Sequence, residues 1–81
     1  MLEMNRLQEM MAQGTGVEGR WIPVAEREPA RPGTYTVIRR RRSGHYDYDT
    51  FIWRGMWLSL AGQPIKATEA WFERKEAGAD G

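Results

Sequence analysis

Hydrophobic positions along the chain follow a helical period at the N-terminus and a strand period after it. In residues 1–13, MLEMNRLQEMMAQ, apolar side chains recur every three or four positions, at Met4, Leu7, Met10 and Met11. This spacing predicts an amphipathic helix that ends at a Gly-rich hinge over residues 14–20. A helix of this length is marginal alone. Its stripe is therefore expected to dock on its own sheet or to join two copies in a homo-oligomer, unless the segment stays disordered.

From Trp21 onward, short runs of β-branched and aromatic residues are separated by Gly, Pro and Ser, which is typical of antiparallel strands. The runs cover residues 21–24, 34–42, 45–53, 56–60 and 65–73. Pro23 has no N–H to donate, so its run is expected at a sheet edge or a strand start. The predicted fold class is α+β, a small antiparallel meander of three or four strands with one N-terminal amphipathic helix. The β domain spans residues 21–73, and a polar tail follows over residues 74–81.

The most unusual segment reads RRRRSGHYDYD from position 39. Its Ser-Gly dipeptide predicts a two-residue hairpin loop. With this loop, one face of the hairpin carries Arg39 and Arg41 beside two tyrosines, on whose rings the guanidinium planes can stack. The other face carries an ion pair between Arg40 and Asp47. A shift of the register by one residue would exchange the two faces.

Two interpretations of this hairpin stay open. In the first, it is a long solvated hairpin whose charges cancel across its two strands. In the second, its outer half is a recognition surface, because Arg and Tyr are enriched at binding hot spots. Trp53 is expected at the surface or at an interface, whereas Trp21, Trp57 and Trp71 are expected in the core. The predicted partner-binding residues are the arginines and aromatics of this segment: Arg39, Arg40, Arg41, Arg42, Tyr46, Tyr48 and Trp53.

Charge and size narrow the classes of function. The 81 residues make one small domain, and 12 basic against 11 acidic side chains leave a net charge of +1. A dedicated nucleic-acid binder is expected to be strongly basic. Arginines interleaved with aromatics suit phosphate contact and base stacking, but Asp47 and Asp49 lie across the hairpin and would repel phosphate. Nucleic-acid binding is therefore a weaker alternative.

The residues give little basis for catalysis or for a cofactor. The chain has no cysteine and a single histidine, His45, at the hairpin turn. His45, Asp47 and Asp49 could point together, but three mixed ligands are a weak metal signal. Ser43 and Ser59 lack the context of an activated nucleophile. We expect a protein that is not an enzyme and that holds no cofactor and no metal.

Short motifs distributed over residues 20–73 resemble a family of unknown function from tailed phages and prophages, the domain-of-unknown-function family five-five-one. The family opens with Trp-Ile-x-Val, continues through a turn to a tryptophan and closes on a His-Trp-Met-Pro strand. The matching positions are Trp21, Ile22, Val24, Glu26, Pro29, Gly33, Val37, Gly55, Trp57, Trp71 and Phe72. Ala70 stands where the family has its histidine, so any role of that histidine is missing. The resemblance implies a phage-type accessory protein in a bacterial cytoplasm.

The expected function is non-catalytic binding of a host protein, such as a CRISPR effector or another defence component, through the Arg/Tyr hairpin. One alternative is a sponge that sequesters a nucleotide immune signal, with tryptophans stacking on the base and arginines holding phosphates. No run of apolar residues reaches the length of a membrane span. With the absence of cysteine, this favours a cytoplasmic protein that does not contact a membrane.

Overall fold

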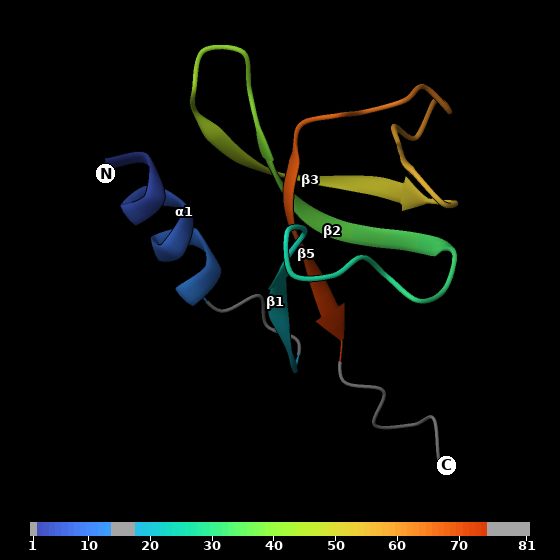
Figure 1. Ribbon diagram of the computed structural model, residues 1–81, viewed down its shortest axis with the longest axis horizontal. Helices are drawn as coiled ribbons and strands as arrows, with labels where there is room; N and C mark the ends of the chain where they lie inside the picture. The colour runs from blue at the N-terminus through green and yellow to red at the C-terminus, as the bar shows by residue number, and fades with distance from the viewer. Residues whose placement is uncertain (1, 14–17, 75–81) are drawn as a thin grey trace.

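The computed structural model describes residues 2–13 and 18–74, with side chains from residue 6 onward. It contains one helix and five strands in a single antiparallel sheet (Figure 1): α1 (Leu2–Ala12), β1 (Gly19–Pro23), β2 (Gly33–Arg40), β3 (Tyr46–Trp53), β4 (Trp57–Leu58) and β5 (Thr68–Arg74). The helix and the antiparallel sheet confirm the prediction, but the strand count of three or four is wrong. Within these ranges, no helix has the length and apolar content needed to cross a membrane.

The predicted segment boundaries need correction at both ends of the sheet. Gly19 and Arg20 belong to β1, so the hinge expected over residues 14–20 extends too far. Arg74 belongs to β5 rather than to the polar tail. The rest of the predicted hinge, residues 14–17, and the tail residues 75–81 lie outside the described residues.

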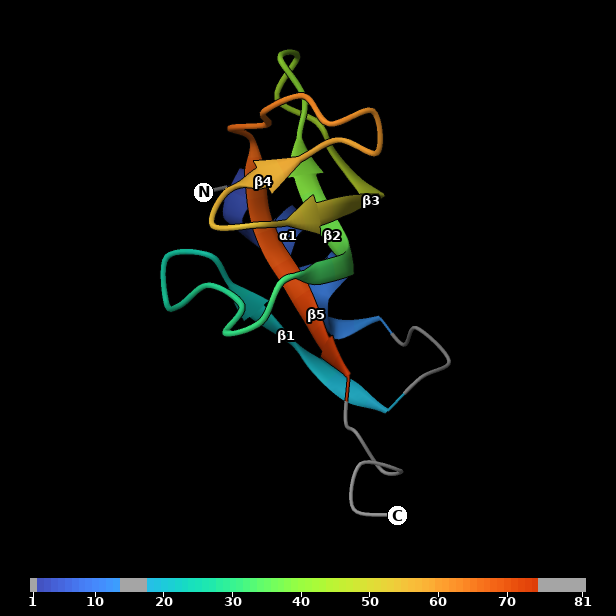
Figure 2. The same cartoon turned by 90° about the vertical axis from the view of Figure 1, so that its right-hand side faces the viewer.

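The strand order is β1-β5-β2-β3-β4, so the sheet is not the predicted meander. β5 returns from the far side of the sheet and inserts between β1 and β2 (Figure 2). Three consecutive residues of β5, Ala70, Trp71 and Phe72, are buried, because a central strand that is covered on both faces needs apolar residues on both. β1 is an edge strand, which confirms the position expected for Pro23.

The two faces of the sheet bury separate apolar clusters. The cluster beneath α1 comprises Met10, Trp21, Ile38, Tyr46, Ala70 and Phe72. The opposite cluster comprises Ile22, Val37, Phe51, Trp53, Trp57 and Trp71. The burial of Trp21, Trp57 and Trp71 confirms the core role expected for them. The expected exposure of Trp53 is wrong, because the β3–β4 register sets it directly opposite Trp57, with ring centroids 5.0 Å apart, and leaves it 8% exposed.

The helix packs on the sheet of its own chain. Met10 is buried in the cluster beneath α1, and Leu7 and Met11 pack against that cluster. The hydroxyl of Tyr48 in β3 also donates a hydrogen bond of 2.7 Å to the backbone oxygen of Met10. This carbonyl at the end of α1 also accepts from the N–H of Gln13 at 3.3 Å, so the tyrosine adds a second hydrogen bond that joins the helix to the sheet. The side chain of Met4 lies outside the described part, and a homo-oligomer through this stripe would require α1 to leave the sheet.

Candidate interaction site at the β2–β3 hairpin

The hairpin reverses through three residues, Arg42, Ser43 and Gly44. The N–H of Gly44 donates to the oxygen of Arg41 at 2.8 Å, and the N–H of Arg41 donates to the oxygen of His45 at 2.7 Å. Gly44 has a φ of 94°, which fits a turn that ends in a glycine bulge. The predicted two-residue loop is therefore wrong. That loop would favour a positive φ at Ser43 as well, whereas the bulge requires it only at Gly44, where no Cβ opposes it.

This turn shifts the register by one residue and exchanges the two faces of the hairpin. Arg40 pairs with Tyr46, Arg39 with Asp47, and Ile38 with Tyr48. The tyrosines therefore lie on the face of α1, and the aspartates lie on the opposite face with Arg39. The prediction that Arg39 and Arg41 stack on the tyrosines is therefore wrong. The predicted ion pair between Arg40 and Asp47 is wrong as well.

Ion pairs connect the two strands diagonally on the face away from α1. Nη1 of Arg39 lies 3.3 Å from Oδ2 of Asp49, and Nε of Arg41 donates to Oδ2 of Asp47. The hydrogen bond and the charge of Asp47 raise the pKa of Arg41. The guanidinium of Arg39 also lies 5.5 Å from the ring centroid of Phe51. For Arg39 and Arg41, the charges thus cancel across the hairpin, as in the first of the two interpretations.

The predicted partner-binding residues differ in how far they reach the surface. Arg40, Arg41 and Arg42 are exposed, and Tyr48 is 45% exposed although its hydroxyl is bound to α1. The side chain of Arg39 is only 25% exposed. The buried members are Tyr46 and Trp53. Of the full predicted set, three arginines and one tyrosine are therefore exposed at the surface.

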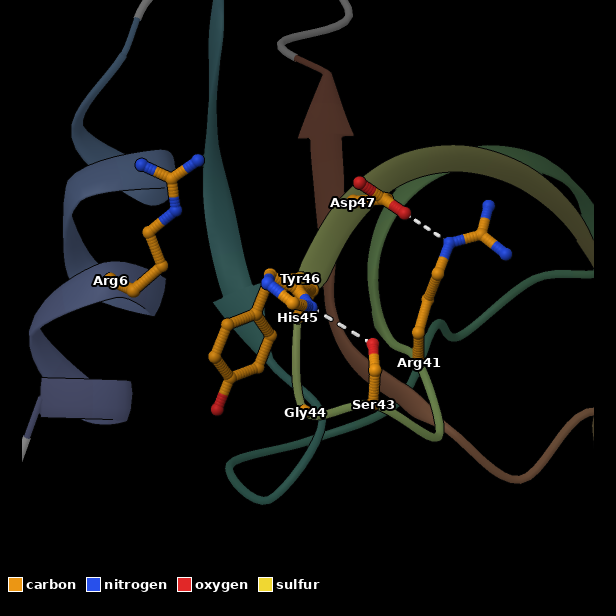
Figure 3. A pocket seen from close by; sticks show the side chains of 7 residues that line it. All are labelled: Arg6, Arg41, Ser43, Gly44, His45, Tyr46 and Asp47. Carbon is orange, nitrogen blue, oxygen red and sulfur yellow. Dashed lines mark hydrogen bonds and ion pairs between the residues drawn. The ribbon is translucent and has the colours of Figure 1, made fainter.

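A groove of about 520 Å³ lies beside the hairpin (Figure 3). Its lining residues come from the hairpin and from α1: Arg6, Arg41, Ser43, Gly44, His45, Tyr46 and Asp47. The ring of Tyr46 points into the space between the hairpin and α1, and Arg6 projects from the helix on the far side (Figure 3). Nη1 of Arg6 lies 3.7 Å from Oε1 of Glu9, with which it forms an ion pair on the helix. Sequence patterns do not predict this groove, because no local pattern indicates that α1 packs beside the hairpin.

The groove contains one contact of catalytic type, between Ser43 and His45. Oγ of Ser43 lies 2.9 Å from Nδ1 of His45, and both side chains are exposed at the turn. Within residues 2–13 and 18–74, no carboxylate is hydrogen-bonded to His45 to orient its ring. The same part of the chain holds no group of three His, Cys, Asp or Glu residues placed to bind a metal ion. An activated serine nucleophile usually has a third group that orients its base.

Comparisons with models of protein families, with curated proteins and with solved structures return no match for this chain. The resemblance to the phage family therefore rests on the short motifs alone.

Proposed function

We propose that this protein acts without catalysis, by binding a partner protein through the β2–β3 hairpin. The observation that supports this most directly is the composition of the exposed hairpin surface. Arg40, Arg41 and Arg42 lie at its end, and the ring of Tyr48 is exposed on its α1 side. Arg and Tyr contribute more than most residues to the affinity of interfaces. The partner we propose is a host defence component such as a CRISPR effector, on the basis of the family resemblance.

Most large apolar residues outside the hairpin are buried in the two clusters of the fold or pack against them. They are therefore not available for binding, and this favours the hairpin as the binding surface. All four tryptophans belong to the two buried clusters. Of the large apolar residues in the described part, only Tyr48, Met56 and Leu60 are strongly exposed. Met56 and Leu60 follow β3, beyond the end opposite the hairpin turn. Of these three residues only Tyr48 is aromatic, and it lies on the hairpin that also exposes Arg40, Arg41 and Arg42.

The first test removes two arginines from the hairpin end. We expect the double variant Arg40→Ala/Arg42→Ala to lose at least about tenfold in affinity for the partner, because hot-spot truncations cost about 2 kcal/mol or more. Co-expression with a panel of CRISPR effectors, with plasmid interference as the readout, identifies the partner. Affinity purification with the same variants then measures binding. The thermal midpoint of unfolding is expected to stay within about 5 °C, since changes at surface residues are usually small.

The matched control is Arg31→Ala/Arg54→Ala, which removes the same net charge from exposed positions outside the hairpin. It should bind like the unmodified protein. Equal binding by both double variants would refute the hairpin as the interface. If every CRISPR effector of the panel keeps full plasmid interference when co-expressed with the unmodified protein, the proposed class of partner is refuted.

A second candidate function, the nucleotide sponge, is favoured by the groove. Arg6 and Arg41 line the groove and can contact phosphate, whereas Tyr46 and the four tryptophans are buried and cannot stack on a base as first expected. Calorimetry with cyclic nucleotides and ADP-ribose derivatives tests this idea. Binding that Arg6→Ala weakens about tenfold would support it, because one charged hydrogen bond contributes about 1.5–3 kcal/mol. No heat with any of these ligands would exclude it.

Nucleic-acid binding receives the least support from the hairpin. Asp49 and Asp47 neutralise Arg39 and Arg41, which lowers the positive potential that phosphate contacts require. Such binding would weaken steeply as salt is raised, and this separates it from the two functions above.

A further inference from the structure

β3 is much longer than the strand that covers its outer side. It runs over Tyr46–Trp53, but β4 pairs with it only at Ile52 and Trp53. In the part of the chain that the structure describes, no strand pairs with the outer side of β3 from residue 46 to residue 51. An open edge of this kind can accept a further strand.

The register shows which backbone groups face outward along this edge. The N–H of Arg41 donates to the oxygen of His45, so the backbone groups of His45 face β2. Every second residue of β3 does the same, which includes Asp47 and Asp49. The backbone groups at residues 46, 48 and 50 therefore face away from the sheet. The N–H of Thr50 is occupied, because it donates to Oδ1 of Asp49 at 2.8 Å. Tyr46 and Tyr48 each present both an N–H and a C=O.

The side chains beside the edge differ between the two faces of the sheet. On the α1 face, the exposed ring of Tyr48 offers apolar surface. On the other face, the side chains of Asp47 and Asp49 are 44% and 37% exposed. The groove includes Tyr46 and Asp47, so open space adjoins the first part of this edge. A strand added here would meet an aromatic surface on one face and carboxylates on the other.

These aspartates oppose the addition of a second copy of the same strand. In an antiparallel pair, outward-facing positions 46, 48 and 50 must hydrogen-bond to one another across the interface. Centring the pair on Tyr48 sets Asp47 opposite Asp49 of the second copy. Moving the centre by one residue in either direction sets Asp47 against Asp47, or Asp49 against Asp49. Like charges directly opposite each other destabilise a sheet. Arg39 and Arg41 pair with these carboxylates from the β2 side, away from the open edge, so the charges nearest to an added strand are those of Asp47 and Asp49. The edge therefore favours a different chain with the opposite charge.

We propose that the outer edge of β3 over residues 46–50 takes up an extended segment of the partner protein as an added antiparallel strand. Basic residues of that segment lie opposite Asp47 and Asp49, and the alternate apolar residues lie on Tyr48. This inference rests on the proposed function, since it specifies how the hairpin holds its partner. Backbone hydrogen bonds supply affinity, and the alternation of charge and apolar surface supplies selectivity.

The first experiment measures amide hydrogen exchange in the free protein by NMR. The N–H groups of Tyr46 and Tyr48 should exchange at least about tenfold faster than those of Asp47 and Asp49, which are bonded to β2. Equal protection at all four amides would mean that the edge is already covered and would overturn the proposal.

The second experiment adds a short capped peptide of alternating lysine and valine as the probe. Resonances of Tyr46, Tyr48 and Thr50 should shift, and the amides of Tyr46 and Tyr48 should become protected from exchange. A peptide of alternating glutamate and valine is the control and should bind at least about tenfold more weakly, because it sets like charges opposite each other. Equal binding of both peptides, or shifts confined to another surface, would overturn the proposal.

The third experiment compares Tyr48→Pro with Tyr48→Ala, both of which remove the ring, whereas only proline removes the outward N–H. Circular dichroism establishes that both variants fold. Tyr48→Pro should bind the lysine–valine peptide about tenfold more weakly than Tyr48→Ala, and equal binding would overturn strand addition. If a partner is lost on Arg40→Ala/Arg42→Ala but is retained equally by Tyr48→Pro and Tyr48→Ala, the proposed function holds and the edge inference fails. If the lysine–valine peptide binds at the edge but no protein partner is found, the edge inference holds and the proposed function fails.

Discussion

Replacing Trp71 with alanine is expected to destabilise the protein by about 3–5 kcal/mol, the cost of deleting a large aromatic side chain from a core. Trp71 is 2% exposed and lies on β5, an interior strand between β1 and β2. Its ring packs against Tyr35 with a centroid distance of 5.4 Å. Its indole N–H donates to the backbone oxygen of Arg27 at 3.0 Å, and the Arg27 guanidinium lies 5.3 Å from its ring centroid. Trp71 therefore holds the loop between β1 and β2 against the sheet.

The measurement is urea unfolding followed by far-ultraviolet circular dichroism. For a domain of this size, the loss corresponds to a fall in thermal midpoint of at least about 12 °C. Trp71→Phe is the first control, since it keeps an aromatic ring and loses the indole hydrogen bond, and should cost less than Trp71→Ala. Leu60→Ala is the second, because Leu60 is 66% exposed and should change stability by less than about 0.5 kcal/mol. A loss below about 1 kcal/mol for Trp71→Ala would contradict the core role of this residue.

The sequence predicts the kinds of secondary structure better than their arrangement. Periodicity is a local property, and it places α1 and the β2–β3 hairpin close to their observed positions. The position of β5 is not local, because it depends on which distant edge the last strand joins. Its three consecutive buried residues indicate a strand covered on both faces, and this signal would have favoured a central position over the end of a meander.

The candidate site shows how one residue of register decides the chemistry of a surface. The sequence indicates the residue types of the hairpin, but the two-residue loop sets the arginines of one strand beside the wrong residues of the other. The deciding feature is Gly44, which takes the positive φ in a longer turn. Arg39 and Arg41 then meet aspartates instead of tyrosines, and Tyr48 becomes free to contact α1. No local pattern in the first thirteen residues could reveal this last contact.

The same pairing of charges has a consequence for solubility as well as for binding. An open β-edge invites self-association, and charged side chains beside it are a common protection. Asp47 and Asp49 supply that protection here, while Arg39 and Arg41 hold them in place. The Arg41–Asp47 pair is exposed and the Arg39–Asp49 pair is half-buried, and ion pairs this close to the surface contribute little to folding. Their stronger effect is on which chain the edge can accept.

Ala70→His is expected to destabilise the protein by about 2–5 kcal/mol, through overpacking and through burial of an imidazole without a partner. Ala70 has no exposed surface, and it lies beneath α1 in the cluster that contains Met10 and Ile38. It is also the position at which the phage family has histidine. An imidazole at this position would occupy the space into which Met10 packs, so the helix and the histidine compete for the same site.

The dependence on pH separates the two causes of this loss. Burial lowers the pKa of the introduced imidazole below the value near 6.5 of an unfolded chain, so the unfolded state binds the additional proton first. The stability of Ala70→His should therefore fall further as the pH drops below about 6.5, relative to the unmodified protein. Ala70→Leu is the matched control, since it overpacks the site without a titratable group and should show no such additional loss. Urea unfolding at several pH values measures both variants. Parallel pH profiles for the two would show that the helix moves aside and leaves the imidazole in water.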